Sequence, residues 1–141
     1  MRQTQQDLQN EGEILAIAAS KWGSVGVKLP EGGKYRLDAV LLDGSDIKAW
    51  VEIKDYSKPF IGLNIPKYLE GMLIAQMTGI TFLFIIRLDG RVGYIKLHDG
   101  LVACEPPRYQ YAGGTPKGRE PLPDDVEPMA MFTKESFKWI N

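Results

Sequence analysis

The stretch YRLDAVLLDGSDIKAWVEIKDY, residues 35 to 56, decides the fold of this chain. Two apolar segments rich in β-branched and aromatic residues flank the turn-like DGSD, a pattern that predicts an antiparallel strand pair. Charged residues interrupt both segments, since Asp38 lies in the first and Glu52 and Lys54 lie in the second. Core strands rarely contain charged side chains, so these three residues require an explanation other than packing.

The register of this strand pair decides whether the two carboxylates meet. If residues 44–46 form a three-residue loop, Val40 pairs with Trp50 and Asp38 with Glu52. Directly opposed residues have Cβ atoms about 4.5–5.5 Å apart. Two carboxylates at that distance repel each other and raise each other's pKa unless a cation lies between them. A two-residue loop would instead shift the register by one residue and place Asp38 and Glu52 on opposite faces.

A divalent cation would relieve the repulsion between Asp38 and Glu52. Mg²⁺ prefers oxygen ligands and is typically held by one or two carboxylates together with water and phosphate oxygens. Lys54 lies two residues beyond Glu52 and so points to the same face, where it could orient or deprotonate an attacking water. These groups suit metal-assisted hydrolysis of a phosphodiester. The alternative is a solvated sheet face, on which Glu and Lys are ordinary surface residues.

The whole sequence predicts one α/β domain over residues 1–141. We expect helices over 4–22 and 66–79, strands over 24–29, 35–43, 47–54 and 80–88, a loop over 54–66, and a hairpin from residue 88 into a further strand. Residues 105–128 contain six of the nine prolines and predict a long surface loop. Residues 129–141 predict a short strand and a last helical turn, with Thr133 as its N-cap.

The first predicted helix has a carboxylate on its apolar stripe. Spacings of three and four residues join Glu11 to four apolar positions, Leu8, Leu15, Ala18 and Trp22. Glu13 lies on a neighbouring face of the same helix. Because a carboxylate on a core-facing stripe is unusual, Glu11 is a candidate site residue.

Composition and charge exclude several classes of protein. The net charge of −1 and the isoelectric point near 5.8 exclude the general basic excess of many nucleic-acid binders, but not a local basic patch. The apolar run 82–86 is far shorter than the roughly 20 residues that span a membrane, and the polar N-terminus does not match a signal peptide. The single cysteine, Cys104, cannot form an intramolecular disulfide and is expected to be a small buried residue, and His98 is expected at a strand end. We therefore expect a soluble protein of the cytoplasm, the host's if the chain is phage-encoded.

The order of these features resembles the PD-(D/E)XK nuclease superfamily, which includes restriction endonucleases, archaeal Holliday-junction resolvases and small phage-encoded nucleases. The matching motifs are Asp38 in YRLDAVL and Glu52-Ile53-Lys54 in AWVEIKDY, followed by the helix KYLEGMLIAQMTG and the apolar strand ITFLFIIRLDG. The resemblance covers about residues 5–97. It implies a restriction-endonuclease-like αβββαβ core, in which a mixed central sheet is flanked by helices and the central hairpin splays around the active site.

The resemblance also implies a metal site. Asp38 and Glu52 would bind Mg²⁺ or Mn²⁺, the backbone carbonyl of Ile53 would be a further ligand, and Lys54 would position the nucleophilic water. Leu37 stands where the superfamily motif has the proline that names it.

Two helical residues complete the site by resemblance. A helical glutamate usually joins the acidic cluster as a catalytic residue and metal ligand, and Glu11 matches it best, with Glu13 as the alternative. A glutamine on the following helix often joins the site as well. Gln76 fits that role, and an ordinary surface amide is the alternative for this residue.

Basic residues near the predicted hairpin are candidates for phosphate contacts, which supply most non-specific affinity for nucleic acid. They are Lys34, Arg36, Lys58 and Lys67. Residues 107–119 interleave basic residues with Tyr109 and Tyr111, which suits stacking on single-stranded or distorted nucleic acid or an incidental connector. No zinc motif, P-loop or recognition-helix signature is present, so we expect contacts to the DNA backbone without sequence-specific reading. DNA rather than RNA is implied by the resemblance alone.

The sequence leaves two classes of function open. The leading hypothesis is a metal-dependent nuclease that hydrolyses DNA. The alternative is a binding module of the same fold, with little or no cleavage, which the slightly acidic charge favours. Cutting two strands symmetrically needs two sites, which a homodimer would supply, but nothing in the sequence decides between a monomer and a dimer.

Overall fold

The computed structural model describes residues 4–30, 36–112 and 127–141. The elements follow in the order α1 (Gln5–Lys21), β1 (Val25–Lys28), β2 (Ala39–Asp43), β3 (Asp46–Tyr56), β4 (Ile61–Asn64), α2 (Ile65–Thr78), β5 (Thr81–Leu88), β6 (Arg91–His98), β7 (Arg108–Ala112), β8 (Glu127–Phe132), the short 3₁₀ helix η2 (Lys134–Ser136) and β9 (Lys138–Trp139).

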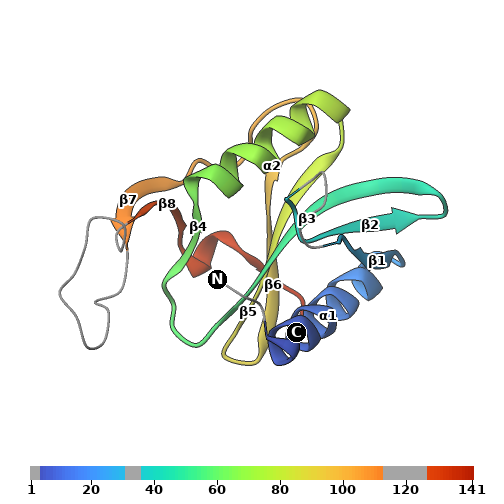
Figure 1. Ribbon diagram of the computed structural model, residues 1–141, viewed down its shortest axis with the longest axis horizontal. Helices are drawn as coiled ribbons and strands as arrows, with labels where there is room; N and C mark the ends of the chain where they lie inside the picture. Colours follow the sequence, from blue (N-terminus) through green and yellow to red (C-terminus); the bar gives the residue numbers. More distant parts are fainter. Residues whose placement is uncertain (1–3, 31–35, 113–126) are drawn as a thin grey trace.

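Two sheets organise the molecule. Six strands form a mixed sheet in the order β1-β2-β3-β5-β6-β9, and three form a smaller sheet in the order β4-β8-β7. Within the described residues, β3 and β5 run parallel and the other pairs run antiparallel. The parallel pair needs a crossover, which β4 and α2 supply. Helices α1 and α2 lie on opposite sides of the large sheet (Figure 1). This confirms the predicted α/β core, in which helices flank a mixed central sheet.

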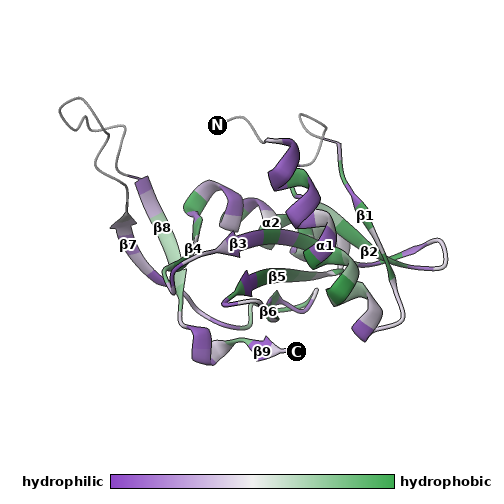
Figure 2. Cartoon of the chain, turned by 90° about the horizontal axis from the view of Figure 1, so that it is seen from below, coloured by the Kyte–Doolittle hydropathy of each residue, from purple (hydrophilic) through white to green (hydrophobic). Residues whose placement is uncertain are grey.

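The large sheet is buried on both faces. The cluster on the α2 side includes Val40, Trp50, Phe82, Phe84 and Ile86, and the cluster on the α1 side includes Ile14, Leu41, Val51, Leu83 and Ile85. Successive residues of β5 alternate between these clusters because side chains in a strand point alternately to its two faces. The predicted two-sided burial of this strand is therefore confirmed, and Figure 2 shows its hydrophobic character at the centre of the sheet.

Both predicted helices form, and local capping explains where they begin. Thr4 caps α1 in a reciprocal capping box with Asp7. Asn64 caps α2 by accepting a 2.9 Å hydrogen bond from the backbone N–H of Lys67. Gly79 ends α2 with a φ of 71°, a left-handed conformation that glycine adopts without strain.

The β2–β3 hairpin has the predicted pairing at its inner end and a different loop. Val40 pairs with Trp50 as predicted, but Asp43 pairs with Asp46, so the loop has two residues instead of three. A β-bulge at Lys48 restores the register. Lys48 has no partner on β2, while the residues on either side of it, Ile47 and Ala49, pair with consecutive residues of β2. The prediction that a two-residue loop separates the carboxylates was therefore wrong, since a β-bulge absorbs one residue.

Two predicted loops contain strands. Within 54–66, β3 continues to Tyr56 and β4 follows, while within 105–128 the described part contains β7; the prediction for 113–126 lies outside the described residues. Both missed strands pair with β8, which lies far away in the sequence. Such pairing leaves little local signal, so sequence patterns alone read these segments as loops.

The C-terminal segment joins both sheets. Strand β8 forms where a strand was expected, and the expected helical turn is η2, although Thr133 at its N-cap position makes no side-chain capping bond. Strand β9 then pairs with β6 at the edge of the large sheet.

Two single-residue expectations have opposite outcomes. His98 ends β6 as expected and is buried. Cys104 is exposed, so its expected burial was wrong, because the turn after β6 leaves it at the surface. Of the helices in the described parts, none has the length and apolar character needed to cross a membrane.

Candidate active site

Asp38 lies where β2 and β3 separate. Its backbone N–H donates to the carbonyl of Val51 at 3.1 Å, and the regular ladder ends there. The next N–H of β3 that points toward the β2 side is that of Ile53. It donates to Asp38 Oδ2 at 2.9 Å instead of to a carbonyl of β2. Because a residue's N–H and C=O leave a strand on the same side, the carbonyl of Ile53 also faces this opening. The Asp38 side chain thus holds the splayed end of the hairpin.

Glu52 is the most deeply buried carboxylate of the described residues, with no exposed surface. Its Oε2 has no hydrogen-bond donor when both carboxyl groups are ionised. Burial first, and then the charge of Asp38, raise the pKa of Glu52 to about 8. Lys67 and Lys54 oppose the shift without cancelling it. This carboxyl group is therefore costly to ionise without a further cation.

Lys67 reaches both carboxylates from the first turn of α2. Its Nζ lies 3.5 Å from Glu52 Oε1, 3.8 Å from Asp38 Oδ1 and 3.4 Å from the carbonyl oxygen of Arg36. Burial lowers the pKa of Lys67, but the charges of Glu52, Asp38 and Glu11 outweigh it and leave the pKa raised. The sequence predicts a phosphate contact for Lys67. It gives no sign of the contact with Asp38 and Glu52, which we call the acid pair, because that contact depends on how α2 packs against the sheet.

Glu11 is buried on α1 and forms an ion pair with Lys28 of β1. Its charge also contributes to the raised pKa of Lys67, so it belongs to the same electrostatic neighbourhood. The partner Lys28 was missed from the sequence. The pairing becomes visible only in the structure, where an added Cβ at Gly26 would lie against Leu15 of α1 and Lys28 shares the strand face of Gly26.

Glu13, the alternative helical acid, lies elsewhere. Its carboxylate is about half exposed and pairs with Arg87 of β5 at 3.2 Å. Arg87 also binds Asp55 at 2.8 Å. The structure therefore brings Glu11, and not Glu13, into the electrostatic neighbourhood of Lys67.

Lys54 and Gln76 differ in how close they come to the acid pair. Lys54 is exposed, shares the strand face of Glu52, and its charge lowers the pKa of Glu52. Gln76 is exposed near the C-terminal end of α2, nine residues beyond Lys67. At 1.5 Å per residue that separation is about 13.5 Å along the helix axis. Gln76 is not brought to the acid pair.

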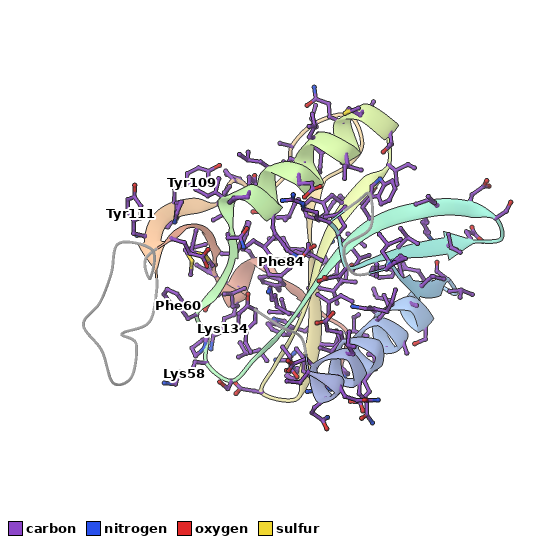
Figure 3. The ribbon with its side chains drawn as sticks, viewed as in Figure 1. Lys58, Phe60, Phe84, Tyr109, Tyr111 and Lys134 are labelled. Carbon is purple, nitrogen blue, oxygen red and sulfur yellow. The ribbon has the colours of Figure 1, made fainter. Side chains whose placement is uncertain are left out.

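The other predicted phosphate contacts lie in different parts of the chain. Arg36 is exposed beside the pair, and its backbone N–H donates to Glu70 of α2 at 3.4 Å. Lys58 lies in the exposed β3–β4 connection (Figure 3), where its backbone carbonyl accepts a hydrogen bond from the N–H of Phe60 at 2.8 Å. Lys34 lies outside the described residues.

Tyr56 anchors the connection that leaves the site and was also missed from the sequence. Its hydroxyl donates to the carbonyl of Gly62 at 2.7 Å and accepts from the N–H of the same residue at 3.1 Å. Burial above all raises its pKa to about 12; the bond with Gly62 opposes the rise and the charge of Glu52 adds to it. Tyr56 therefore stays a neutral hydroxyl that fixes β4 against the end of β3.

The donor set fits a hard divalent cation. Two carboxylates meet with an unsatisfied buried oxygen, and Mg²⁺ commonly takes one or two carboxylates plus water and phosphate oxygens. In the described ranges, no three His, Cys, Asp or Glu side chains gather closely enough to form an all-protein metal cage. The arrangement thus suits an open site that shares its cation with a ligand.

Comparisons with known proteins place the chain in a family. The family model described as "Phage putative PDDEXK endonuclease" matches residues 1–140, so the chain belongs to that PD-(D/E)XK endonuclease family. Among solved structures, the chain is similar to the Holliday junction resolvase Hjc of the archaeal hyperthermophile Archaeoglobus fulgidus, with a TM-score of 0.52 and 14% identity over 62% of this chain and 75% of that one. At this identity the likeness shows a shared fold. No curated protein matches the sequence.

Proposed function

We propose that this protein is a metal-dependent nuclease that hydrolyses DNA phosphodiester bonds. The observation that carries the proposal is the Glu52 carboxyl group, fully buried beside Asp38 with an oxygen that no donor in the described residues satisfies. An acid pair of this kind costs stability unless a cation compensates it, so its presence supports a functional role. Membership of an endonuclease family supports the same conclusion.

Asp38, Glu52 and the Ile53 carbonyl would hold Mg²⁺, and Mn²⁺ would substitute for it. Such an ion supplies Lewis-acid stabilisation of the charge on a phosphate group. Glu11, paired with Lys28, adds negative potential around the two carboxylates instead of forming a third close ligand. Gln76 has no part in this arrangement.

Lys54 is the proposed catalytic cation. It is exposed on the strand face of Glu52, so its ammonium group can reach solvent and substrate at once. There it would orient the attacking water and donate to a phosphate oxygen that gains charge. Its exposure distinguishes it from Lys67, which contacts the acid pair directly.

Arg36 and Lys58, with Lys34, would bind the DNA backbone on either side of the cleaved bond. Contacts to phosphates position a duplex without reading its sequence, which agrees with the absence of a recognition-helix motif. Tyr109 and Tyr111 are exposed on β7 (Figure 3) and could stack on unpaired bases. The solved structure of similar fold is titled a Holliday junction resolvase, so a four-way junction belongs among the substrates to be tested.

Cleavage of labelled DNA tests the proposal. Single-stranded, duplex, flap and four-way-junction substrates are incubated with Mg²⁺ or Mn²⁺, with EDTA and with the Lys54→Ala variant as controls. We expect metal-dependent cutting that EDTA and the substitution both abolish.

Failure to cut any substrate, by protein shown to be folded, would favour the alternative of a binding module. The net charge of −1 is the observation that favours this alternative. Binding of the same substrates without cleavage would then identify its ligand.

A further inference from the structure

Lys67 lies where a cation between the two carboxylates would lie. Its Nζ is 3.5 Å from Glu52 and 3.8 Å from Asp38. Within the described residues, no other basic side chain forms an ion pair with either carboxylate. An ammonium group this close to both acids repels any second cation that approaches them.

Lys67 is held by charge more than by close hydrogen bonds. Its three contacts are 3.4 to 3.8 Å long, whereas charge-assisted bonds are usually about 2.7–2.9 Å. About a third of its side chain is exposed, and a lysine stem has four rotatable carbons. The backbone N–H is fixed by Asn64, so the ammonium group can leave the acids while α2 stays in place.

The position of Lys67 on the helix is electrostatically unfavourable without the acids. It is the third residue after the N-cap Asn64, and the first turn of α2 has no acidic residue. A positive charge at a helix N-terminus opposes the helix dipole. The acid pair compensates this charge, and a phosphate would compensate it equally well.

We propose that Lys67 is a resident counter-ion that occupies the acid pair until a divalent metal displaces it, which frees the ammonium group to bind a DNA phosphate. This inference rests on the proposed function for its phosphate step and on the geometry for its metal step. Metal binding and phosphate binding then strengthen each other through one side chain. Because such coupling is reciprocal, DNA would raise metal affinity as much as metal raises DNA affinity.

The metal step is tested by Mn²⁺ affinity, measured by electron paramagnetic resonance without DNA. The measurement is made at pH 8, where protons compete less for Glu52 than at neutral pH. Lys67→Met removes the charge and keeps the stem, and Lys48→Met is the matched control at an exposed position of the same strand as Glu52. We expect Lys67→Met to bind Mn²⁺ about tenfold more tightly and Lys48→Met to bind like the wild type. Unchanged or weaker binding by folded Lys67→Met would overturn the proposal.

Lys67→Arg provides a second variant should Lys67→Met fold poorly. The guanidinium retains the competing charge, so its Mn²⁺ affinity should stay near or below that of the wild type. Affinity several-fold above the wild type would contradict a role for the charge.

The phosphate step is tested by DNA affinity in a Lys54→Ala background, where cleavage is not expected. Fluorescence anisotropy of a labelled junction is measured in EDTA and in Mn²⁺. We expect Mn²⁺ to increase the affinity of Lys54→Ala by more than that of Lys54→Ala/Lys67→Met. An equal increase in both would overturn the coupling. A protein that never cuts DNA but shows the Mn²⁺ result would disprove the proposed function and leave the counter-ion role standing.

Discussion

Asp38 does two things with one carboxylate. Its Oδ2 accepts the N–H of Ile53 and so keeps the hairpin open, while its Oδ1 faces Lys67. Two substitutions separate these functions. The side-chain amide oxygen of asparagine can still accept the hydrogen bond from the Ile53 N–H, whereas the methyl group of alanine cannot.

Asp38→Asn should therefore abolish cleavage and leave the urea midpoint close to that of the wild type, since the amide oxygen keeps the Ile53 bond. Asp38→Ala should abolish cleavage and also lower the free energy of unfolding by about 1–2 kcal/mol, because the part-buried Ile53 N–H loses its acceptor. Paired denaturation curves measure the difference. Equal stability of the two variants would show that this hydrogen bond does not support the hairpin.

Glu52 makes the stability of the metal-free protein depend on pH. Its pKa is about 8 in the folded state against an ordinary 4.5, so between these values the folded state binds a proton that the unfolded state has released. The contribution of Glu52 to the free energy of unfolding is therefore fully present below about pH 4.5 and is lost progressively as the pH rises toward 8. The loss amounts to a few kcal/mol.

Glu52→Gln should flatten this fall, since an amide does not titrate. Urea denaturation in EDTA at pH 6, 7 and 8 measures the free energy of unfolding of the wild type and of the variant. We expect the variant to gain stability relative to the wild type as the pH rises. A constant difference across this range would mean that Glu52 ionises readily in the folded protein.

At the scale of the element, α2 positions Lys67 by lying close to the sheet. The backbone of α2 comes close to the sheet at Gly71, where an added Cβ would lie 2.2 Å from the ring of Phe82. Gly12 of α1 offers a matched contrast, since a Cβ there would meet nothing within 4 Å. The same substitution thus has opposite expected effects in the two helices.

Gly71→Ala should lower the free energy of unfolding by about 1–3 kcal/mol, because the helix must shift away from a packed ring. Gly12→Ala should raise it by about 0.5–1 kcal/mol, through the better helix propensity of alanine. Chemical denaturation with EDTA present measures both. A neutral Gly71→Ala would indicate that Phe82 repacks easily and that α2 is not held at this point.

The elements also show which features a sequence can predict. Residues 4–22, 66–79 and 80–88 were predicted well because their periodicity and capping are local. The nearness of the Asp38 and Glu52 carboxylates was predicted through a wrong loop length and a strand pair that the ladder does not contain, since the bulge at Lys48 has no pattern of its own. The contact of Lys67 with the acids was missed because it depends on the approach of α2 to the sheet at Gly71.

At the scale of the whole molecule, the C-terminal segment completes the core on the α2 side. Ala130 and Phe132 of β8 and Phe137 after η2 are buried there, and the rings of Phe132 and Phe137 lie 5.9 Å and 5.8 Å from that of Phe84. In Figure 1 this red segment runs from the small sheet to the edge of the large one. The segment contributes no residue to the acid pair, and it supports the fold through these buried rings and through the pairing of β8 with β4 and β7.

Removing residues 127–141 should therefore prevent cooperative folding. Strand β4 would lose its pairing partner and β6 its neighbour β9, and the surface beside Phe84 would face water. Each large apolar side chain that loses its burial costs about 1.5–3 kcal/mol, and a typical domain is stable by only about 5–15 kcal/mol. We expect the shortened chain to show no cooperative thermal transition by circular dichroism. The single substitution Phe137→Ala should be milder. We expect it to keep a cooperative transition and to lower the free energy of unfolding by about 3–5 kcal/mol. A shortened chain that unfolds cooperatively near the temperature of the full chain would show that α1, α2 and the inner strands fold without the segment.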